Sequence, residues 1–168
     1  YLCGCLMSNQ KKKKLSNKQL PQFEINNVIS LYSNGQVHEA IEYIATLDET
    51  YPNVPLLFNI LGACYKALGQ LDAAEKMFKT AFTIKPDYAE IHYNLGIVLQ
   101  EQGNLEEAVL SYKKAITIKP GLSEAHSNLG ISLKEQGKMQ EAVTSYQKAM
   151  FLHLNHDASE AVPADFPG

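Results

Sequence analysis

The sequence of 168 residues contains no tryptophan, and its fifteen basic residues are all lysine. Without arginine it lacks the rigid guanidinium group that binds phosphate or carboxylate through two hydrogen bonds, so a dedicated anion site is not expected. The net charge of -3 is too small to indicate nucleic acid as the main partner. Three cysteines, Cys3, Cys5 and Cys64, are too few for a disulfide framework and favour a reducing compartment.

Long hydrophobic runs are also missing, since none approaches the roughly 18 residues that a membrane-spanning helix needs. We therefore expect a cytoplasmic protein. The alternative is a bacterial lipoprotein, because Leu2, Cys3, Gly4 and Cys5 resemble a lipoprotein cleavage box, although no apolar segment precedes them.

Signatures of catalysis are absent too: the sequence has no phosphate-binding P-loop, His-Glu-x-x-His, Gly-x-Ser-x-Gly or Cys-x-x-Cys motif. His153 and His156 have a spacing that suits metal ligands, but no third ligand is near in sequence. We predict no catalytic residue, no metal site, no cofactor and no enzymatic activity.

A repeat with a period of 34 residues dominates what is present, as the spacing of Pro52, Pro86 and Pro120 shows. Residues 89–122 and 123–156 share 17 identities in 34 positions, where random pairing would give about two. The period divides the chain into a basic N-terminal tail and a C-terminal tail on either side of four repeat units. The predicted boundaries are 1–20 for the first tail, 21–54, 55–88, 89–122 and 123–156 for the units, and 157–168 for the second tail.

Each unit is predicted to form two antiparallel helices, because apolar residues recur every three or four positions. Gly103 and its counterparts Gly35, Gly69 and Gly137 fall where the first helix must end in a left-handed residue. Asn104 with Glu107, and Asp87 with Glu90, have the spacing of capping boxes at the helix starts.

Three glycines fall inside predicted first helices, where glycine costs about 1 kcal/mol relative to alanine. Close approach of the second helix at an alanine, with a larger residue filling the next layer, would explain them. The set of signature positions is Leu61, Gly62, Ala74, Phe78, Pro86, Leu95, Gly96, Ala108, Tyr112, Pro120, Leu129, Gly130, Ala142 and Tyr146.

This pattern resembles the tetratricopeptide repeat (TPR) family, including the repeat regions of O-linked N-acetylglucosamine transferases and of bacterial proteins with several such repeats. The resemblance implies an all-α fold, a right-handed α-solenoid of about four helix-turn-helix units. It departs from the family at both ends, where Asn27 and Val28 replace Leu-Gly and Leu154 replaces proline, as expected of terminal repeats.

The resemblance also implies a concave groove lined by the first helices, in which a peptide or partner protein binds. The residues expected there are Asn26, Asn59, Lys66, Tyr93, Asn94, Ile97, Glu101, Ser127, Asn128, Ile131 and Glu135. Asn26, Asn94 and Asn128 share one register and resemble the asparagine ladder of the transferases, interrupted at Ile60. An alternative is that these asparagines fix loops or are solvated.

We predict a scaffold for protein–protein interaction with a protein or peptide partner, no nucleic acid and no direct membrane span. The alternative is the substrate-recruiting arm of a larger sulfotransferase, glycosyltransferase or hydroxylase whose catalytic domain this chain lacks. An apolar face is expected on the last helix, with Val143, Tyr146 and Met150. Three explanations of it compete: a homodimer through the uncapped C-terminal repeat, a following domain that this fragment lacks, and partial cover by the C-terminal tail. The Lys11–Lys14 run is expected to be a solvated tail.

Overall fold

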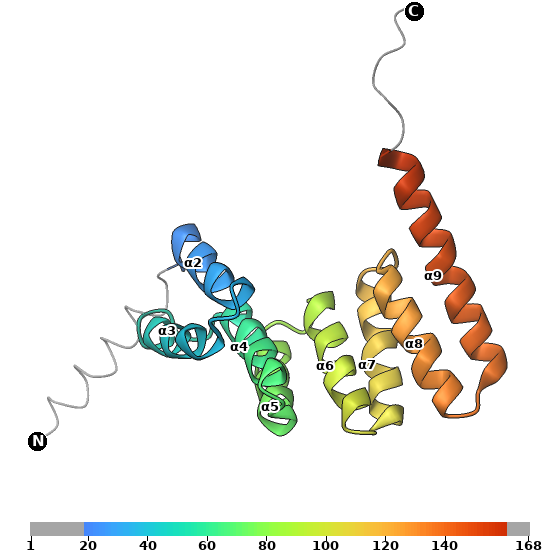
Figure 1. Ribbon diagram of the computed structural model, residues 1–168, viewed down its shortest axis with the longest axis horizontal. Coiled ribbons are helices and arrows are strands. Elements are labelled where there is room, and N and C mark those ends of the chain that lie inside the picture. The colour runs from blue at the N-terminus through green and yellow to red at the C-terminus, as the bar shows by residue number, and fades with distance from the viewer. Residues whose placement is uncertain (1–18, 161–168) are drawn as a thin grey trace, which may run out of the picture. The chain divides into compact units, whose positions relative to one another are not determined.

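The computed structural model describes the backbone of residues 19–160 and the side chains of residues 19–155. Of the predicted tails at 1–20 and 157–168, residues 1–18 and 161–168 lie outside the described residues. Within 19–160 all regular structure is helical, which confirms the predicted all-α class (Figure 1). The helices are α2 (Gln22–Ser33), α3 (Val37–Thr50), α4 (Pro55–Ala67), α5 (Leu71–Ile84), α6 (Ala89–Glu101), α7 (Leu105–Ile118), α8 (Ser123–Glu135) and α9 (Met139–Glu160).

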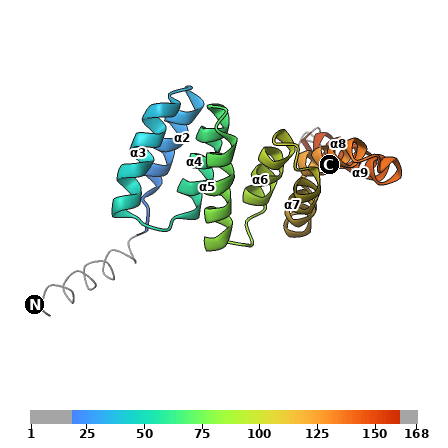
Figure 2. The same cartoon turned by 90° about the horizontal axis from the view of Figure 1, so that it is seen from below.

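The chain forms two compact units that divide between Pro86 and Asp87. The N-terminal unit contains α2 to α5 and the C-terminal unit contains α6 to α9. Within each unit consecutive helices lie side by side as antiparallel pairs, which is clear for α2 to α5 in Figure 2. Each predicted 34-residue repeat thus contains one helix pair.

Glycines end the first helix of every pair. Gly35, Gly69, Gly103 and Gly137 have φ values of 76°, 71°, 80° and 77°, in the left-handed region that glycine enters without strain. After α6 the Asn104 N–H donates to the carbonyl oxygen of Leu99 at 2.8 Å, a bond typical of a Schellman helix end. The turn prediction is confirmed.

The glycines inside α4, α6 and α8 face aromatic rings of the paired helix. A Cβ placed on Gly62, Gly96 or Gly130 would lie 2.7, 2.6 or 2.7 Å from the ring of Phe78, Tyr112 or Tyr146, respectively. The expectation that alanine makes the close contact is therefore wrong. The ring itself occupies the space of the missing side chain, and Ala74, Ala108 and Ala142 are buried elsewhere in the core.

Neither predicted capping box forms. Asn104 precedes α7 and Tyr88 precedes α6, and neither makes a capping hydrogen bond with its side chain. Glu90 instead accepts a hydrogen bond from Nζ of Lys119, at 3.2 Å from Oε1. This ion pair ties the first turn of α6 to the end of α7, so the carboxylate serves the helix pair rather than its own helix.

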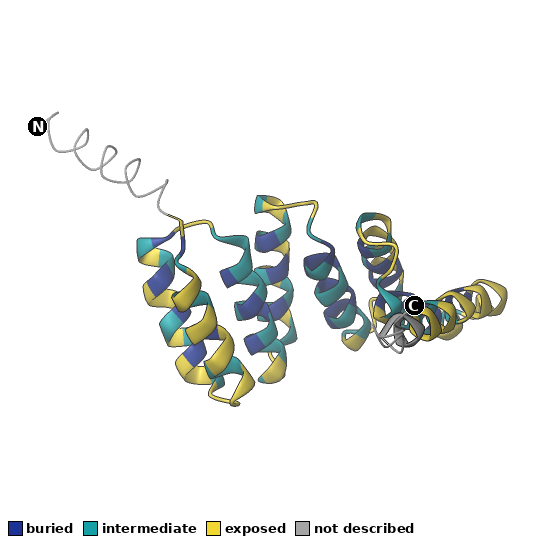
Figure 3. Cartoon of the chain, turned by 90° about the horizontal axis from the view of Figure 1, so that it is seen from above, coloured by how far each residue is buried: buried dark blue, intermediate teal, exposed yellow. Residues whose placement is uncertain are grey.

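The last helix runs past the boundary that the 34-residue period predicts. α9 has 22 residues and α8 has 13, so residues 157–160 are helical and not part of a tail. Leu154 stands where Pro86 and Pro120 follow α5 and α7, and a leucine lets the helix continue. Most described side chains of α9 are exposed, while each of the other helices in its unit has a buried face (Figure 3).

Candidate peptide-binding face of the C-terminal unit

The predicted groove residues of the C-terminal unit lie on α6 and α8, which are neighbours in the structure. Six of them are half-buried and the two glutamates at the helix ends are exposed, as expected for a stripe that reaches solvent beside a core. We call these eight residues the α6/α8 face. They are Tyr93, Asn94, Ile97, Glu101, Ser127, Asn128, Ile131 and Glu135.

Hydrogen bonds connect the two helices at this face. Nδ2 of Asn128 on α8 donates to the hydroxyl of Tyr93 on α6 at 3.3 Å. The Tyr93 ring lies beside that of Tyr112 on α7, with 6.1 Å between centroids and planes tilted by 50°. Asn128 is therefore engaged with a side chain of the neighbouring repeat, and a ligand that uses its amide must share or replace this bond.

A second set of bonds lies deeper and converges on one amide oxygen. Oε1 of Gln100 accepts from the hydroxyl of Tyr112 at 3.0 Å and from that of Ser132 at 3.1 Å. Tyr112 and Ser132 are completely buried, so these bonds satisfy polar atoms that water does not reach. The glutamine thereby fixes the relative positions of α6, α7 and α8 beneath the face.

Sequence reasoning did not single out Gln100 or Ser132. One signal was available, because Ser132 occupies the register of the apolar residues Cys64 and Val98, and a polar residue in a core register needs a partner. Gln100 gave no such signal, since its counterparts Lys66 and Lys134 are polar residues that suit a solvent-facing position.

The hydroxyls of Tyr93 on the face and of Tyr112 beneath it stay neutral at physiological pH. Burial raises the pKa of Tyr93, the nearby Glu124 carboxylate raises it further, and the hydrogen bond from Asn128 opposes both. Burial also raises the pKa of Tyr112, and the carboxylates of Glu101 and Glu135 add to that shift. The hydroxyls therefore act as neutral hydrogen-bonding groups beside a face whose exposed charges are negative.

The predicted groove residues of the N-terminal unit have different surroundings. Asn26 on α2 is exposed, and its Oδ1 accepts a hydrogen bond from Nε2 of Gln22 at 3.0 Å. Asn59 and Lys66 on α4 are half-buried, while Ile60, which interrupts the asparagine register, is 9% exposed.

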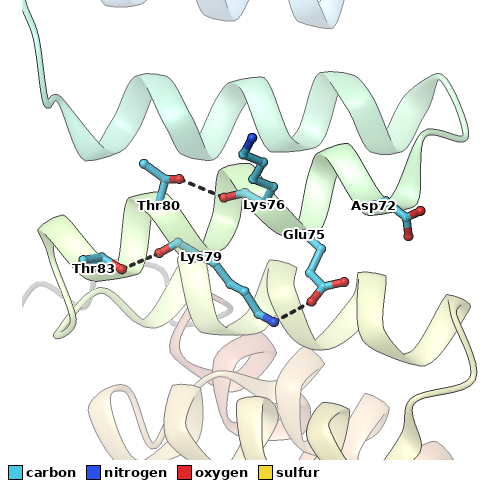
Figure 4. Close-up of a pocket in the computed structure, with 6 residues that line it drawn as sticks. All are labelled: Asp72, Glu75, Lys76, Lys79, Thr80 and Thr83. Carbon is cyan, nitrogen blue, oxygen red and sulfur yellow. Dashed lines mark hydrogen bonds and ion pairs between the residues drawn. The ribbon is translucent and has the colours of Figure 1, made fainter.

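A hollow of the N-terminal unit lies along α5, and its six lining residues all come from that helix (Figure 4). Thr80 and Thr83 donate to the carbonyl oxygens of Lys76 and Lys79, and Nζ of Lys79 pairs with Oε1 of Glu75 at 2.5 Å. These bonds stay within one helix, and no group from a second helix lines the hollow.

Two histidines that occupy the same repeat position on α6 and α8 are buried. His92 and His126 are 8% and 9% exposed, and Nε2 of His126 lies 3.1 Å from the carbonyl oxygen of Pro120. They pack where Phe58 stands in α4, as expected for structural imidazoles. In the described part of the chain no group of three histidine, cysteine or acidic residues is arranged to hold a metal, and the side chain of His156 lies outside it.

Family models decide the classification of the chain. Models described as tetratricopeptide repeats match residues 53–121 and 125–158, more than half of the sequence. The chain belongs to the tetratricopeptide repeat family. The recognition made from the signature positions is confirmed, and the helix pairs are tetratricopeptide repeats that provide a scaffold for protein–protein interaction.

Comparison with individual proteins gives one related sequence and two structures of similar fold. A stretch of 56 residues is 38% identical to anaphase-promoting complex subunit 3 of Dictyostelium discoideum, and the match covers 33% of this chain and 6% of that protein. The chain therefore spans a small fraction of this curated relative.

Two solved structures share the repeat fold. A crystal structure of MamA aligns with a TM-score of 0.75 and 24% identity over 82% of this chain and 80% of that chain. A mutant O-GlcNAc transferase of Thermobaculum terrenum aligns with a TM-score of 0.64 and 24% identity over 67% of this chain and 22% of that chain. At this identity the likeness shows the fold.

Among the helices of the described residues, none is long and apolar enough to cross a bilayer.

Proposed function

We propose that the C-terminal unit binds an extended segment of a partner protein along the α6/α8 face. The observation that carries the proposal is the row of half-exposed amide and hydroxyl groups that two neighbouring repeats present together, with Asn128 bonded to Tyr93 across the helices. The repeats serve binding in this proposal, without catalysis.

The spacing of the asparagines suits an extended backbone. Asn94 and Asn128 occupy the same register on helices that pack about 8–10 Å apart, and an extended chain rises about 3.3 Å per residue. Consecutive asparagines would therefore meet every third residue of the ligand. A primary amide has both donors and an acceptor, so it pairs with a backbone N–H and C=O whatever the ligand's side chains are.

The acidic residues at one end of the face favour basic residues at that end of the proposed ligand. Glu101 and Glu135 are acidic residues that are exposed at the C-terminal ends of α6 and α8. A ligand with lysine or arginine at that end gains roughly 0.2–1 kcal/mol for each exposed pair. The preferred ligand is thus a neutral or basic extended peptide.

Selection from a random peptide library displayed on phage, with the full chain as bait, tests this proposal. The test variant replaces both Asn94 and Asn128 by alanine. Loss of two neutral hydrogen bonds at about 0.5–1.5 kcal/mol each should weaken the selected peptides roughly 5- to 150-fold. The matched control is Asn104→Ala, because Asn104 is exposed and makes no capping bond through its side chain.

The outcomes are distinguishable. Selected peptides should be enriched in lysine or arginine, and Glu101→Gln with Glu135→Gln should weaken them more at low salt than at high salt. Equal affinity for the wild type and the double asparagine variant would refute the proposed face, as would a library that yields no binder.

Self-association is a second part of the proposal. Val143, Met150 and Leu154 on α9 are 41%, 61% and 62% exposed, and a face of this kind at the end of a repeat array is typical of an interface. We therefore propose that copies of the chain associate through the C-terminal repeat.

A further inference from the structure

The last repeat ends in a hollow of about 390 Å³ between α8 and α9. Tyr146, Ala149, Met150 and His153 line it from α9, and α8 contributes Ser123, Glu124 and Ser127. Met150 is 61% exposed, so the hollow is an apolar surface that no segment of the described residues covers.

The repeat period shows what covers the same surface one unit earlier. Moving each lining residue back by 34 positions gives, among others, Tyr112 and Ala115, which are 0% exposed, and Ala89, which is 3% exposed. Helix α8 packs on α7 at this place. The burial of Val109 and its counterpart Val143 differs accordingly, at 6% and 41% exposed. One unit earlier the counterpart surface is thus covered, and the helix that packs on α7 there is α8, the first helix of the next repeat.

The stripe of α8 that contacts the preceding repeat has a distinct composition. Two of its members, Asn128 and Ser132, bond to Tyr93 and Gln100 on α6. Ala125 and Leu129 continue the stripe at helical spacing and are 0% and 6% exposed. An occupant of the hollow must present an equivalent stripe.

Helix α2 repeats part of this stripe with residues that are exposed in the described part of the chain, although the polar Asn27 stands in the register of Leu129. Three repeat periods before Asn128 and Ser132 stand Asn26 and Ser30, the same residue types, and both are exposed. Phe23 stands in the register of Ala125 and is 62% exposed. A large aromatic side chain in this register suits a hollow lined by Tyr146 and Met150.

We propose that the chain associates head to tail, with α2 of one copy packed on α8 and α9 of the next copy as α8 packs on α6 and α7. Phe23 fills the hollow. Asn26 of one copy lies opposite Ser127 of the next, in the place that Asn128 takes opposite Tyr93 within the chain. Ser30 likewise lies opposite Lys134, in the place that Ser132 takes opposite Gln100. Asn26 and Ser30 already accept hydrogen bonds from Gln22 at 3.0 Å and from Asn34 at 3.5 Å, and in this contact their side chains would add bonds across the interface.

Such a contact is heterologous, because the two copies contribute different surfaces. It does not close on itself as a two-fold interface does, and growth continues at both ends. The inference is independent of peptide binding at the α6/α8 face and specifies how the proposed self-association occurs.

Sedimentation velocity and light scattering on the full chain test the arrangement over a range of concentration. The wild type should increase in mass beyond a dimer as concentration rises. Phe23→Asp and Met150→Asp should each raise the concentration needed for association at least tenfold, because a central apolar contact carries much of the affinity. Both residues are exposed in the single copy, and circular dichroism checks that the variants fold.

Mixing the two variants identifies the geometry. Each variant keeps one intact surface, so an equimolar mixture should form a 1:1 dimer that grows no further. Leu110→Asp is the matched control, because Leu110 is 66% exposed on α7 and lies outside both stripes, and this variant should associate as the wild type does.

Three results would overturn the proposal. A wild type that stays monomeric at several hundred micromolar excludes self-association. Association of Phe23→Asp at wild-type strength, with loss only in Met150→Asp, indicates a two-fold contact through α9 instead. Failure of the mixed variants to pair excludes contact between α2 and the hollow.

Discussion

Substitution of Gly96 by alanine tests the packing that holds each helix pair together. A Cβ at this position would lie 2.6, 2.7 and 3.0 Å from three atoms of the Tyr112 ring. Ordinary contact begins at 3.4 Å, so the ring would have to retreat by most of an ångström. It is completely buried and its hydroxyl is bonded to Gln100, so this movement disturbs the core and a hydrogen bond together.

The expected change in the free energy of unfolding combines two destabilising contributions and one stabilising contribution. Overpacking costs about 1–3 kcal/mol, and weakening the bond between Tyr112 and Gln100 adds about 0.5–1.5 kcal/mol. Alanine returns about 1 kcal/mol of helix propensity. We expect Gly96→Ala to lower the free energy of unfolding by about 1–3 kcal/mol, although in an open helix the same change would raise it.

Urea denaturation followed by far-ultraviolet circular dichroism measures this difference, provided that the transition remains cooperative. Gly121→Ala is the matched control, because a Cβ there meets no heavy atom within 4 Å, and its stability should stay within about 0.5 kcal/mol of the wild type. A Gly96→Ala variant as stable as the wild type, or more stable, would refute the packing argument.

A double-mutant cycle separates the clash from other effects. In a Tyr112→Leu background the ring is gone, and Gly96→Ala should then stabilise the protein by up to about 1 kcal/mol through helix propensity. Destabilisation of the same size in both backgrounds would show that the ring is not the cause.

The remaining predictions concern single contacts. Burial raises the pKa of the Cys64 thiol to about 11, so in a variant with the other cysteines replaced by serine, alkylation at pH 8 should be slow until urea unfolds the chain. The same shift predicts stability that is complete below the unfolded thiol pKa and declines as pH rises toward 11, and rapid alkylation of the native protein would contradict the burial. Tyr112→Phe should cost about 0.5–1.5 kcal/mol in urea denaturation, because Gln100 loses one donor; no loss would mean that water replaces the hydroxyl. Lys119→Met should cost less than about 1 kcal/mol, since its pair with Glu90 is half exposed, and a larger, salt-independent loss would contradict that assignment.

Much of the fold could be predicted because the spacing of residues within one repeat determines its helices and turns. Gly103 and its counterparts mark helix ends through φ, which depends on the residue itself. The predicted capping box of Asp87 and Glu90 did not form, because its outcome depends on a residue that is distant in sequence. Glu90 has the required spacing, but Lys119 at the end of the paired helix competes for its carboxylate, and only the folded pair brings that lysine within reach.

The candidate site divides in the same way. Tyr93, Asn94 and Asn128 could be named from their register, because residues at one register of neighbouring repeats share a face. The bond from Asn128 to Tyr93 could not, since it joins residues 35 positions apart through the distance between α6 and α8. Gln100 was missed because its surroundings come from three helices at once.

The sequence by itself determined the repeat, the helix pairs, the turns and the family, because each depends on residues within one period of 34. The tertiary structure alone decided which side chains meet between helices: an aromatic ring against each helical glycine, and a glutamine that joins α6, α7 and α8. Such contacts depend on the volume and distance between packed helices, which spacing along the chain does not specify.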